Sequence, residues 1–416
     1  MNMFFKVKTT EEVLEILQQF PPVGEEKVSL PESFGRVLSS DIVSGEDLPG
    51  FLRSSMDGYA IRARDSFGAT ESLPALFEVI GEVKMGEVPG FRVGQSQAVK
   101  IPTGAMLPDG ADSVVMVEYC HVLDERTLEI SRAVFPQENV IQPQDDYRKG
   151  QRVLPKGQRL RPQDLGVLAS VGILEISAFK KPRVAIISTG DEVITVDKKP
   201  QPGQVRDINT YTLSAFCRQL WAEPVVLGLC GDRFEQVCRL LERGLSLADT
   251  VWISGGSSVG TRDLTLKVFE SIQELEVLVH GISISPGKPT IIARKGSCAV
   301  IGLPGHAASA MVVAEVFLRP FMQRLSGELH TAPEAGGEVE ARLSRNVESA
   351  SGRDDFIRVR LEKKDGDWIA VPIFGKSGLI STLVDSDGLI RIDRNSEGLY
   401  EGDTVRVFLF EPMKGV

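Results

Sequence analysis

From residue 182 to residue 327, short apolar runs alternate with segments whose apolar positions recur every three or four residues. An apolar run rich in β-branched residues indicates a buried strand, and the longer spacing indicates an amphipathic helix. Strands that alternate with helices are typical of βαβ units, so this region predicts a parallel sheet with helices on both faces. The strand runs are RVAIIS, EPVVLGLC, TVWIS, TIIAR and AVIGL, and the helical runs include NTYTLSAFCRQL, DRFEQVCRLLERGL and DLTLKVFESIQ.

A strand pattern without helices occupies two other regions. Between residues 77 and 130, runs such as FEVIGEV and DSVVMVE lie between glycine and proline turns, which predicts a small β domain over residues 50–140. After residue 327, the runs EVEARL, DFIRVRLEK, DWIAVPI and GDTVRVFLF predict a C-terminal β domain over residues 328–416. The chain therefore combines an α/β part with two β parts.

The remaining segments predict a connector domain. Residues 9–20 begin with threonine and carry acids in the first turn, which favours a short helix that two prolines end. Pro162 stands at the first turn of a second expected helix. We assign residues 1–49 and 141–178 to a discontinuous connector and residues 179–327 to the α/β domain. The length of 416 residues agrees with several domains, since single cores stop growing at roughly 250–300 residues.

The composition excludes several classes of protein. A net charge of −10 argues against a broad nucleic-acid surface, which needs clustered lysines and arginines. The five cysteines contain no CxxC pair and are expected to be reduced thiols, and the four histidines lack zinc-site spacing. No apolar run reaches the roughly 20 residues of a membrane helix, and the N-terminus lacks a signal-peptide core. We therefore expect a cytoplasmic enzyme that binds neither nucleic acid nor membrane.

Glycine turns follow two of the expected strands. TVWIS ends in Ser254, Gly255 and Gly256, and such a turn exposes backbone N–H groups that can bind an anion. RVAIIS ends in a similar turn, followed by Asp191 and Glu192. The carboxyl ends of parallel strands line one crevice, so both turns are expected to face the same ligand.

Charged residues follow the other strands. Asp232 comes after VVLGLC, Asp263 lies just past the Ser-Gly-Gly turn, and Lys288 stands in PGKP before TIIAR. A single aspartate at a helix start is more often a cap than a functional residue. Phosphate binding with a magnesium ion held by acids, however, requires a combination of groups: backbone N–H donors, a lysine and several carboxylates. We therefore predict a Mg²⁺ site in which Glu192, Asp232 and Asp263 are the candidate ligands.

Six motifs in fixed order make a more specific match. They are SMDGYAIR at 55–62, PTGAMLPDGADSVVMVE at 102–118, RVAIISTGDEV at 183–193, SGGSSVGTRD at 254–263, PGKP at 286–289 and LPG at 303–305. These motifs resemble the signatures of the molybdopterin molybdenumtransferase family, which includes MoeA and the gephyrin E domain. The resemblance covers nearly the whole chain.

The resemblance implies both a fold and an activity. The expected fold class is multidomain α/β plus β, with a three-layer α/β molybdopterin-binding domain, a small β domain, an elongated connector domain and a C-terminal β-barrel-like domain. The expected activity is insertion of molybdenum from molybdate into adenylylated molybdopterin with release of AMP, helped by Mg²⁺. The implied partners are a second copy of the chain in a homodimer, other proteins of molybdenum cofactor biosynthesis and acceptor apoenzymes.

The resemblance also implies roles for single residues, carried over motif by motif. The implied catalytic residues are Asp57, Asp146, Glu192, Asp232 and Asp263. The implied substrate-binding residues are Thr103, Ser254, Gly255, Gly256, Ser258, Lys288, Pro304, Gly305, His306, Arg353 and Ser377. The chemistry agrees, because molybdate is a doubly charged oxyanion that a lysine, a forked arginine and serine hydroxyls can bind.

The chain departs from the family pattern at Ile141, Gln144, Ser257, Ser285 and His306. Our favoured interpretation of His306 is that it replaces an asparagine helix cap; a changed substrate contact is the alternative. Ile141 and Ser285 remove two cations, and each charge-assisted bond to phosphate is worth about 1.5–3 kcal/mol. A non-catalytic or divergent molybdopterin-binding scaffold, with another metal preference, therefore stays a second hypothesis. A third, an adenylyltransferase acting one step earlier, is disfavoured by the additional domains.

Overall fold

The computed structural model describes residues 7–255, 259–329 and 337–411, without the side chains of residues 259–263. Its contacts divide the chain into two compact units. The first unit comprises residues 1–40, 156–161 and 175–416, and the second comprises residues 41–155 and 162–174. The finer division into four domains stays a prediction.

The first unit contains a six-stranded sheet in the order β16-β13-β17-β21-β20-β18. β13, β16, β17 and β21 pair in parallel, as their apolar runs predict. β20 is antiparallel to both of its neighbours, which differs from the parallel sheet we expected. The reason is the short turn around Gly296, since parallel neighbours need a long crossover. The bounds are β13 Arg183–Thr189, β16 Glu223–Cys230, β17 Thr250–Ser254, β18 Glu276–His280, β20 Ile291–Lys295 and β21 Cys298–Leu303.

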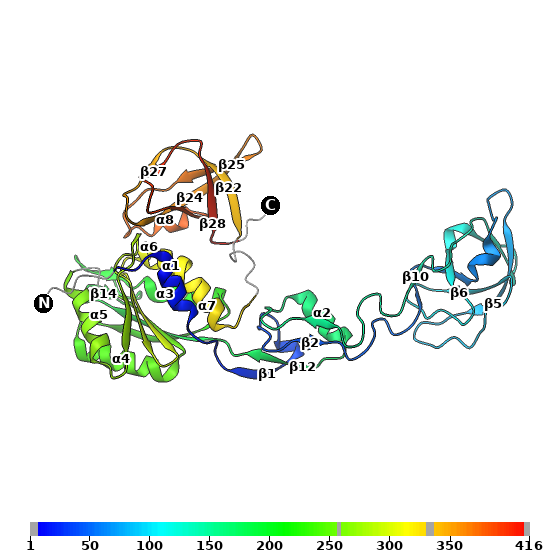
Figure 1. Ribbon diagram of the computed structural model, residues 1–416, viewed down its shortest axis with the longest axis horizontal. Coiled ribbons are helices and arrows are strands. Elements are labelled where there is room, and N and C mark those ends of the chain that lie inside the picture. The colour runs from blue at the N-terminus through cyan, green and yellow to red at the C-terminus, as the bar shows by residue number, and fades with distance from the viewer. Residues whose placement is uncertain (1–6, 256–258, 330–336, 412–416) are drawn as a thin grey trace. The chain divides into compact units, whose positions relative to one another are not determined.

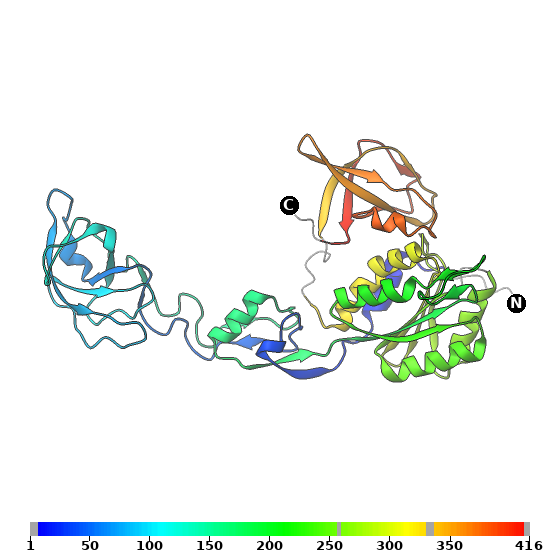
Figure 2. The ribbon, with the colours of Figure 1, turned by 180° about the vertical axis from the view of Figure 1, so that it is seen from behind.

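Helices cover both faces of this sheet, which confirms the three-layer arrangement (Figures 1 and 2). Val184 and Ile186 on β13 pack into one core, and Ala185 and Ile187 pack into the other, because successive strand side chains point to opposite faces. The first face carries α1 (Thr10–Gln18), α3 (Asn209–Gln219), α6 (Ala307–Val313), the π-helical η4 (Ala314–Leu318) and α7 (Arg319–Leu325). The second face carries α4 (Phe234–Leu247) and α5 (Val259–Ser271).

The N-terminal helix α1 begins at a capping box, as the sequence predicts. Thr9 Oγ1 accepts from the Glu12 backbone N–H at 3.3 Å, and the Thr9 N–H donates to Glu12 Oε2 at 2.9 Å. One face of the helix then carries Val13 and Leu17, which are buried with Phe20 in the first core of the α/β sheet. α1 is thus anchored on the α/β sheet although nearly 170 residues of other structure follow it before the sheet begins.

The C-terminal part forms a closed barrel, because β24 pairs with β25 on one side and with β26 on the other. Inward-facing apolar side chains of its strands make a separate core. This confirms the expected barrel-like domain. The strands are β22 Glu338–Leu343, β24 Asp354–Lys364, β25 Asp367–Pro372, β26 Gly388–Ile392 and β28 Thr404–Leu409, with the pair β23 Val347–Glu348 and β27 Gly398–Leu399 and the short helix α8 Ser381–Val384.

Short strands complete the first unit. β1 (Glu25–Ser29) pairs with β12 (Glu175–Phe179), and β14 (Val193–Ile194) pairs with β15 (Val205–Arg206). β19 (Ile284–Ser285) leaves the α/β part and pairs in parallel with the start of β24. The 3₁₀ helix η1 covers Leu30–Glu32.

The second unit contains a six-stranded sheet in the order β7-β4-β6-β5-β9-β8, with a core on each face. The β domain expected over residues 50–140 lies here. Its strands are β4 Gly58–Ile61, β5 Ala75–Glu82, β6 Gln97–Ile101, β7 Ser113–Met116, β8 Cys120–Val122 and β9 Thr127–Ile130. Beside them are the pairs β2 Ile42–Val43 with β11 Arg152–Leu154 and β3 Arg53–Ser54 with β10 Val140–Ile141, the 3₁₀ helices η2 Ala63–Ser66 and η3 Val117–Tyr119, and α2 Pro162–Ser170.

The five cysteines are free thiols, as their spacing predicts. Burial raises the pKa of Cys217 and of Cys298 to about 12, so both stay protonated at neutral pH. Over the described ranges, no helix combines the length and the apolar character needed to span a membrane.

Candidate functional site

Polar side chains lie at the carboxyl ends of the parallel strands, on both faces of the sheet. Ser188 of β13 is in register with Ser254 of β17, and both continue the face that packs against α3 and α6. Thr189 and Gly255, one residue further, belong to the opposite face, which α4 and α5 cover. The edge therefore has two polar sectors, one on each side of the sheet.

The sector on the α4 side is acidic. The Asp232 backbone N–H donates to Asp191 Oδ1 at 3.1 Å, so the turns after β13 and β16 are held together. Burial raises the pKa of Asp232, and the negative charges of Asp191 and Glu192 raise it further, against a hydrogen bond from Thr189 that lowers it. The Oδ1 atom of Asp232 is buried without a hydrogen-bond partner. A cation bound near Asp232 would remove the electrostatic repulsion among these three acids.

The predicted metal ligands are brought together only in part. Glu192 and Asp232 lie in the acidic sector, and Asp191 joins them although our ligand set did not include it. Asp263 lies in α5, but its side chain is outside the described residues. Among the side chains that the structure describes, no group of three or more His, Cys, Asp or Glu has the geometry of a complete metal site. The ligand set therefore stays a prediction.

The turn after β17 needs glycine at its first position. A Cβ atom on Gly255 would lie 1.8 Å from Thr189 Oγ1 and 2.7 Å from the Thr189 carbonyl oxygen. The two strand ends thus approach each other more closely than any side chain at position 255 allows. Gly256, Ser257 and Ser258, which we expect to line the anion site, lie outside the described residues.

We expect Gly255→Ala to lower the free energy of unfolding by about 2 kcal/mol, because the strand ends must separate to admit the methyl group. Urea unfolding followed by circular dichroism measures the change. Gly24→Ala is the matched control, since its Cβ would meet only the Lys180 side chain at an ordinary 3.9 Å. Equal midpoints for the two variants would show that the β13 and β17 ends are not in tight contact.

The sector on the α3 side contains Ser188, Asp207 and Asn209 and was missed in the sequence. Asp207 Oδ1 accepts from Ser188 Oγ at 3.0 Å and from the Thr210 N–H at 3.1 Å, and the Asn209 side-chain amide donates to the Gly305 carbonyl at 2.9 Å. These contacts fix the start of α3 against the turn after β21. The available signal was Asp207 just before the helical run NTYTLSAFCRQL, which is the position of a helix cap.

The LPG turn after β21 contains Pro304 and Gly305 and leads to His306 at the N-cap position of α6. His306 makes no capping hydrogen bond with its side chain, so our interpretation of it as a cap is wrong. Its Nδ1 atom instead lies 2.9 Å from Ser377 Oγ of the C-terminal barrel domain. The Ala308 N–H also donates to the Ser377 carbonyl at 3.3 Å. Two predicted substrate-binding residues, His306 and Ser377, are therefore in direct contact.

The two predicted cations lie on segments that the pairing of β19 with β24 brings together. Ile284 is opposite Asp354, so Arg353 immediately precedes the paired residues of β24. The exposed Lys288 lies in the loop after β19, which folds back so that its carbonyl accepts from the Ile282 N–H at 3.0 Å. Arg353 is held by an ion pair of 2.9 Å between its Nε and Asp355 Oδ1. Ser285, a departure from the family pattern, is opposite Asp355.

Three predicted catalytic or binding residues lie in the second unit. The backbone N–H and the hydroxyl of Thr103 donate to Asp57 Oδ1 at 2.7 and 3.0 Å, and these bonds lower the pKa of Asp57. Both side chains are exposed, so the pair presents an ionised carboxylate to solvent. Asp146 is also exposed, and its N–H donates to the Leu48 carbonyl at 3.0 Å.

Gln144 occupies a backbone position that favours glycine. Its φ of 73° is in the left-handed region, which costs a non-glycine residue roughly 1–2 kcal/mol. The side chain offsets part of this cost, because its amide donates to Asp47 Oδ2 at 3.0 Å. A glycine at this position would not meet that cost. Ile141, the neighbouring departure, is paired with Arg53 in the β10–β3 ladder.

Family models match three successive parts of the chain. Residues 8–172 match the MoeA N-terminal region (domain I and II), residues 185–324 match a probable molybdopterin binding domain, and residues 340–410 match the MoeA C-terminal region (domain IV). The matched segments include both sectors of the strand edge and the barrel.

Named proteins and solved structures are similar over almost the full length. A putative molybdopterin biosynthesis protein of Methanocaldococcus jannaschii is 34% identical over 410 residues, covering 96% of each chain. A molybdopterin molybdenumtransferase of Bacillus subtilis is 30% identical over 97% of this chain and 94% of its own. The crystal structure of the molybdopterin biosynthesis MoeA protein of Pyrococcus horikoshii OT3 superposes with a TM-score of 0.83, 31% identity and coverage of 97% and 100%.

Proposed function

Because this chain belongs to the MoeA family of molybdopterin molybdenumtransferases, and so to molybdenum cofactor biosynthesis, we propose that it transfers molybdenum from molybdate into adenylylated molybdopterin and releases AMP. The observation that carries the proposal is the acidic sector around Asp232, with its unpartnered Oδ1, at the same edge of the sheet as the glycine turn after β17 and separated from it by β13. A cation site next to a phosphate cradle suits a reaction in which a phosphate linkage is cleaved.

In this proposal the chain's own residues bind and orient two anions. The glycine turn after β17 would bind the phosphates, as other glycine turns that follow a strand do. Lys288 and Arg353 attract molybdate, and the ion pair with Asp355 keeps the Arg353 side chain from folding away. The hydrogen bonds of Asp207 and Asn209 would keep the start of α3 and the LPG turn fixed while the substrates bind.

Mg²⁺ is part of the proposal as a helper ion. Glu192 and Asp232 would hold it, with Asp263 as the expected third acid. When bound, Mg²⁺ would neutralise the charge that develops on the phosphate oxygens. Without it, Asp232 retains its proton to a higher pH than an ordinary aspartate, because burial and its two acidic neighbours disfavour the charged form.

We also propose that the protein works as a homodimer. The support is the family resemblance together with apolar side chains that remain exposed on the described surface, Phe51, Phe67 and Leu73 among them. Sedimentation equilibrium of the purified chain gives the mass in solution. A single species with the mass of one chain at micromolar concentration would contradict this part of the proposal.

The central experiment incubates the purified protein with adenylylated molybdopterin and Mg²⁺, with and without molybdate, and measures AMP by chromatography. AMP release that depends on molybdate and on Mg²⁺ is the expected result. Tight pterin binding without AMP would favour the scaffold hypothesis, and consumption of ATP with bare molybdopterin would favour the adenylyltransferase. Replacing molybdate by tungstate in the same assay tests which metal the protein prefers.

A further inference from the structure

The contact of His306 with Ser377 joins the α/β sheet to the C-terminal barrel at the edge where the candidate site lies. His306 follows the LPG turn at the end of β21, and Ser377 lies in the irregular segment 373–380 between β25 and α8. The side chains meet at 2.9 Å, and the Ala308 N–H donates to the Ser377 carbonyl at 3.3 Å. Both bonds therefore hold the same residue of the barrel domain.

The segment that carries Ser377 has little other support at its tip. Its base is fixed by Arg358, whose Nη2 donates to the Gly375 carbonyl at 3.1 Å. Lys376, Gly378 and Leu379, around Ser377, are exposed. A chain segment without ladder hydrogen bonds samples many conformations unless side chains restrain it. The Leu379 N–H donates to the Lys376 carbonyl at 3.0 Å and closes a turn around Ser377. The bonds from His306 and Ala308 hold this turn against α6.

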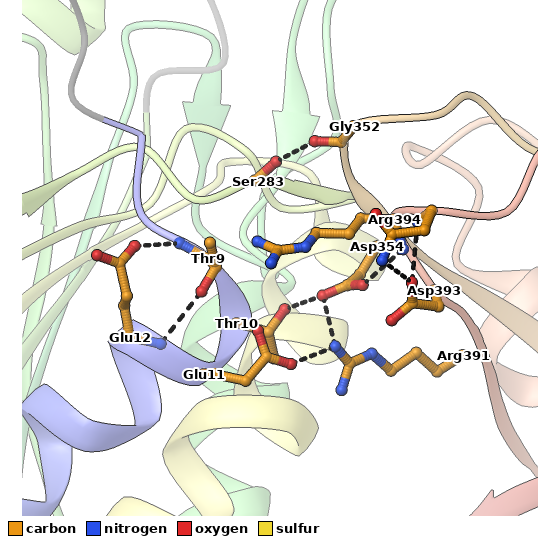
Figure 3. A network of polar contacts seen from close by, with 11 residues as sticks. Thr9, Thr10, Glu11, Glu12, Ser283, Gly352, Asp354, Arg391, Asp393 and Arg394 are labelled. Carbon is orange, nitrogen blue, oxygen red and sulfur yellow. Dashed lines mark hydrogen bonds and ion pairs between the residues drawn. The ribbon is translucent and has the colours of Figure 1, made fainter.

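A second contact region lies at the start of β24 (Figure 3). Asp354 is almost fully buried and accepts hydrogen bonds from Thr10 of α1, from Arg391 at 2.9 Å and from the Arg394 N–H at 3.1 Å. The Ser283 hydroxyl also donates to the Gly352 carbonyl at 2.7 Å. This region attaches the barrel to α1 and β19, so the barrel is held there independently of His306.

We propose that His306 is a positioning residue that holds Ser377, and with it the 373–380 segment, at the mouth of the strand-edge site. The inference rests on the proposed function, in which Ser377 faces the oxyanion. The Asp354 region attaches the barrel as a whole, and the His306 contact sets the segment of the barrel that meets the start of α6.

Side-chain geometry identifies the variant that should restore the contact. Asparagine has a polar atom the same number of bonds from Cα as histidine Nδ1, so it can reach the Ser377 hydroxyl from the same backbone position. Leucine has similar bulk but no polar atom. We therefore expect His306→Asn to keep the contact and His306→Leu to lose it, while the fold of α6 persists in both.

Steady-state AMP release measures the functional effect. His306→Leu is expected to raise the KM for molybdate about tenfold, because one oriented hydrogen bond is lost. The KM for adenylylated molybdopterin should stay within about twofold of that of the unmodified protein. His306→Asn should restore the KM for molybdate to within about threefold of the unmodified protein. Ser377→Ala should raise the KM for molybdate at least as much as His306→Leu, because it also removes the hydroxyl that faces the oxyanion. The double variant should be no worse than Ser377→Ala, since the contact with His306 is already lost there.

Hydrogen exchange supplies a readout that needs no turnover. The Ala308 N–H lies in the first turn of α6, where N–H groups have no partner within the helix, so its protection depends on the Ser377 carbonyl. Its exchange should be at least about fivefold faster in His306→Leu than in His306→Asn. His121→Leu, on the exposed strand β8 of the second unit, is the matched control and should change neither readout.

The outcomes distinguish this inference from the proposed function. If the unmodified protein releases no AMP, the proposed function fails, and exchange at Ala308 still tests the contact. If the unmodified protein is active but His306→Leu keeps both the KM for molybdate and the Ala308 exchange rate, the positioning role is overturned. Equal loss in His306→Asn and His306→Leu would overturn it as well.

Discussion

Asp232→Asn is expected to lower the kcat of AMP release by about 100-fold or more under the proposed function, because a neutral amide cannot take the role proposed for this carboxylate, which is to hold Mg²⁺ at the reacting phosphate. The same change should raise the stability of the protein in the absence of Mg²⁺. The reason is that the charge of Asp232 is opposed by burial and by Asp191 and Glu192, which together raise its pKa. Activity and stability should thus move in opposite directions.

The pH dependence of this stabilisation has a definite sign. An acid with a raised pKa in the folded state binds its proton more tightly there, so folding is favoured as the pH falls. The loss of folding stability caused by Asp232 is therefore absent below its ordinary pKa of 3.8. It grows as the pH rises toward the raised pKa and is complete above that value. Asp232→Asn should melt higher than the unmodified protein near pH 7, and the two should converge toward acid pH.

Thermal unfolding with and without Mg²⁺ completes this experiment. Mg²⁺ should raise the melting temperature of the unmodified protein and leave that of Asp232→Asn unchanged, since a ligand stabilises only the state that binds it. Glu242→Gln removes an exposed acid of α4 in the same domain and is the control for loss of charge alone. A fully active Asp232→Asn, or one that melts lower than the unmodified protein without Mg²⁺, would refute this account of the acidic sector.

Asp354→Asn is expected to lower the free energy of unfolding of the C-terminal part by about 3 kcal/mol, the range for breaking a buried charge pair. Asp354 receives only donors, from Thr10, Arg391 and Arg394 (Figure 3). An amide there leaves Arg391 with Glu11 as its acidic partner and points N–H groups at other N–H groups. The loss should be larger than for any exposed ion pair of the barrel, which is worth at most about 1 kcal/mol.

Urea unfolding followed by tryptophan fluorescence measures this effect, because Trp368 lies on β25 of the barrel. Asp365→Asn is the matched control. Asp365 lies at the exposed turn between β24 and β25 with a φ of 53°, and asparagine adopts that conformation readily, so its change should stay within about 0.5 kcal/mol. Equal midpoints for the two variants would show that Asp354 does not hold the barrel on α1.

Much of the fold could be predicted from local pattern. The capping box at Thr9, the strands of the α/β sheet and the β character of the barrel all follow from residues within one short window, and the structure has them in place. Asp191, Glu192 and Asp232 could be predicted to lie together for a similar reason. Each directly follows a strand, and the parallel ladder brings the strand ends to one edge.

Other features depend on segments that are far apart in the sequence. The direction of β20 was wrong because an apolar run does not reveal whether its connection is a crossover or a tight turn. Asp354 looked like any strand aspartate, yet its partner Thr10 is 344 positions away. His306 looked like a helix cap until the structure showed Ser377, 71 residues later, beside its ring.

The sequence by itself determined the elements, their class and the residues that end each strand, because these depend on periodicity and on backbone preferences that are local. Only the tertiary structure decided which side chains face each other across domains. Three features arise when separate cores pack together. They are the closure of the barrel, the burial of Asp354 and the contact of His306 with Ser377. Burial then set the chemistry of the site, since the pKa of Asp232 rises only where water is excluded and two other acids converge.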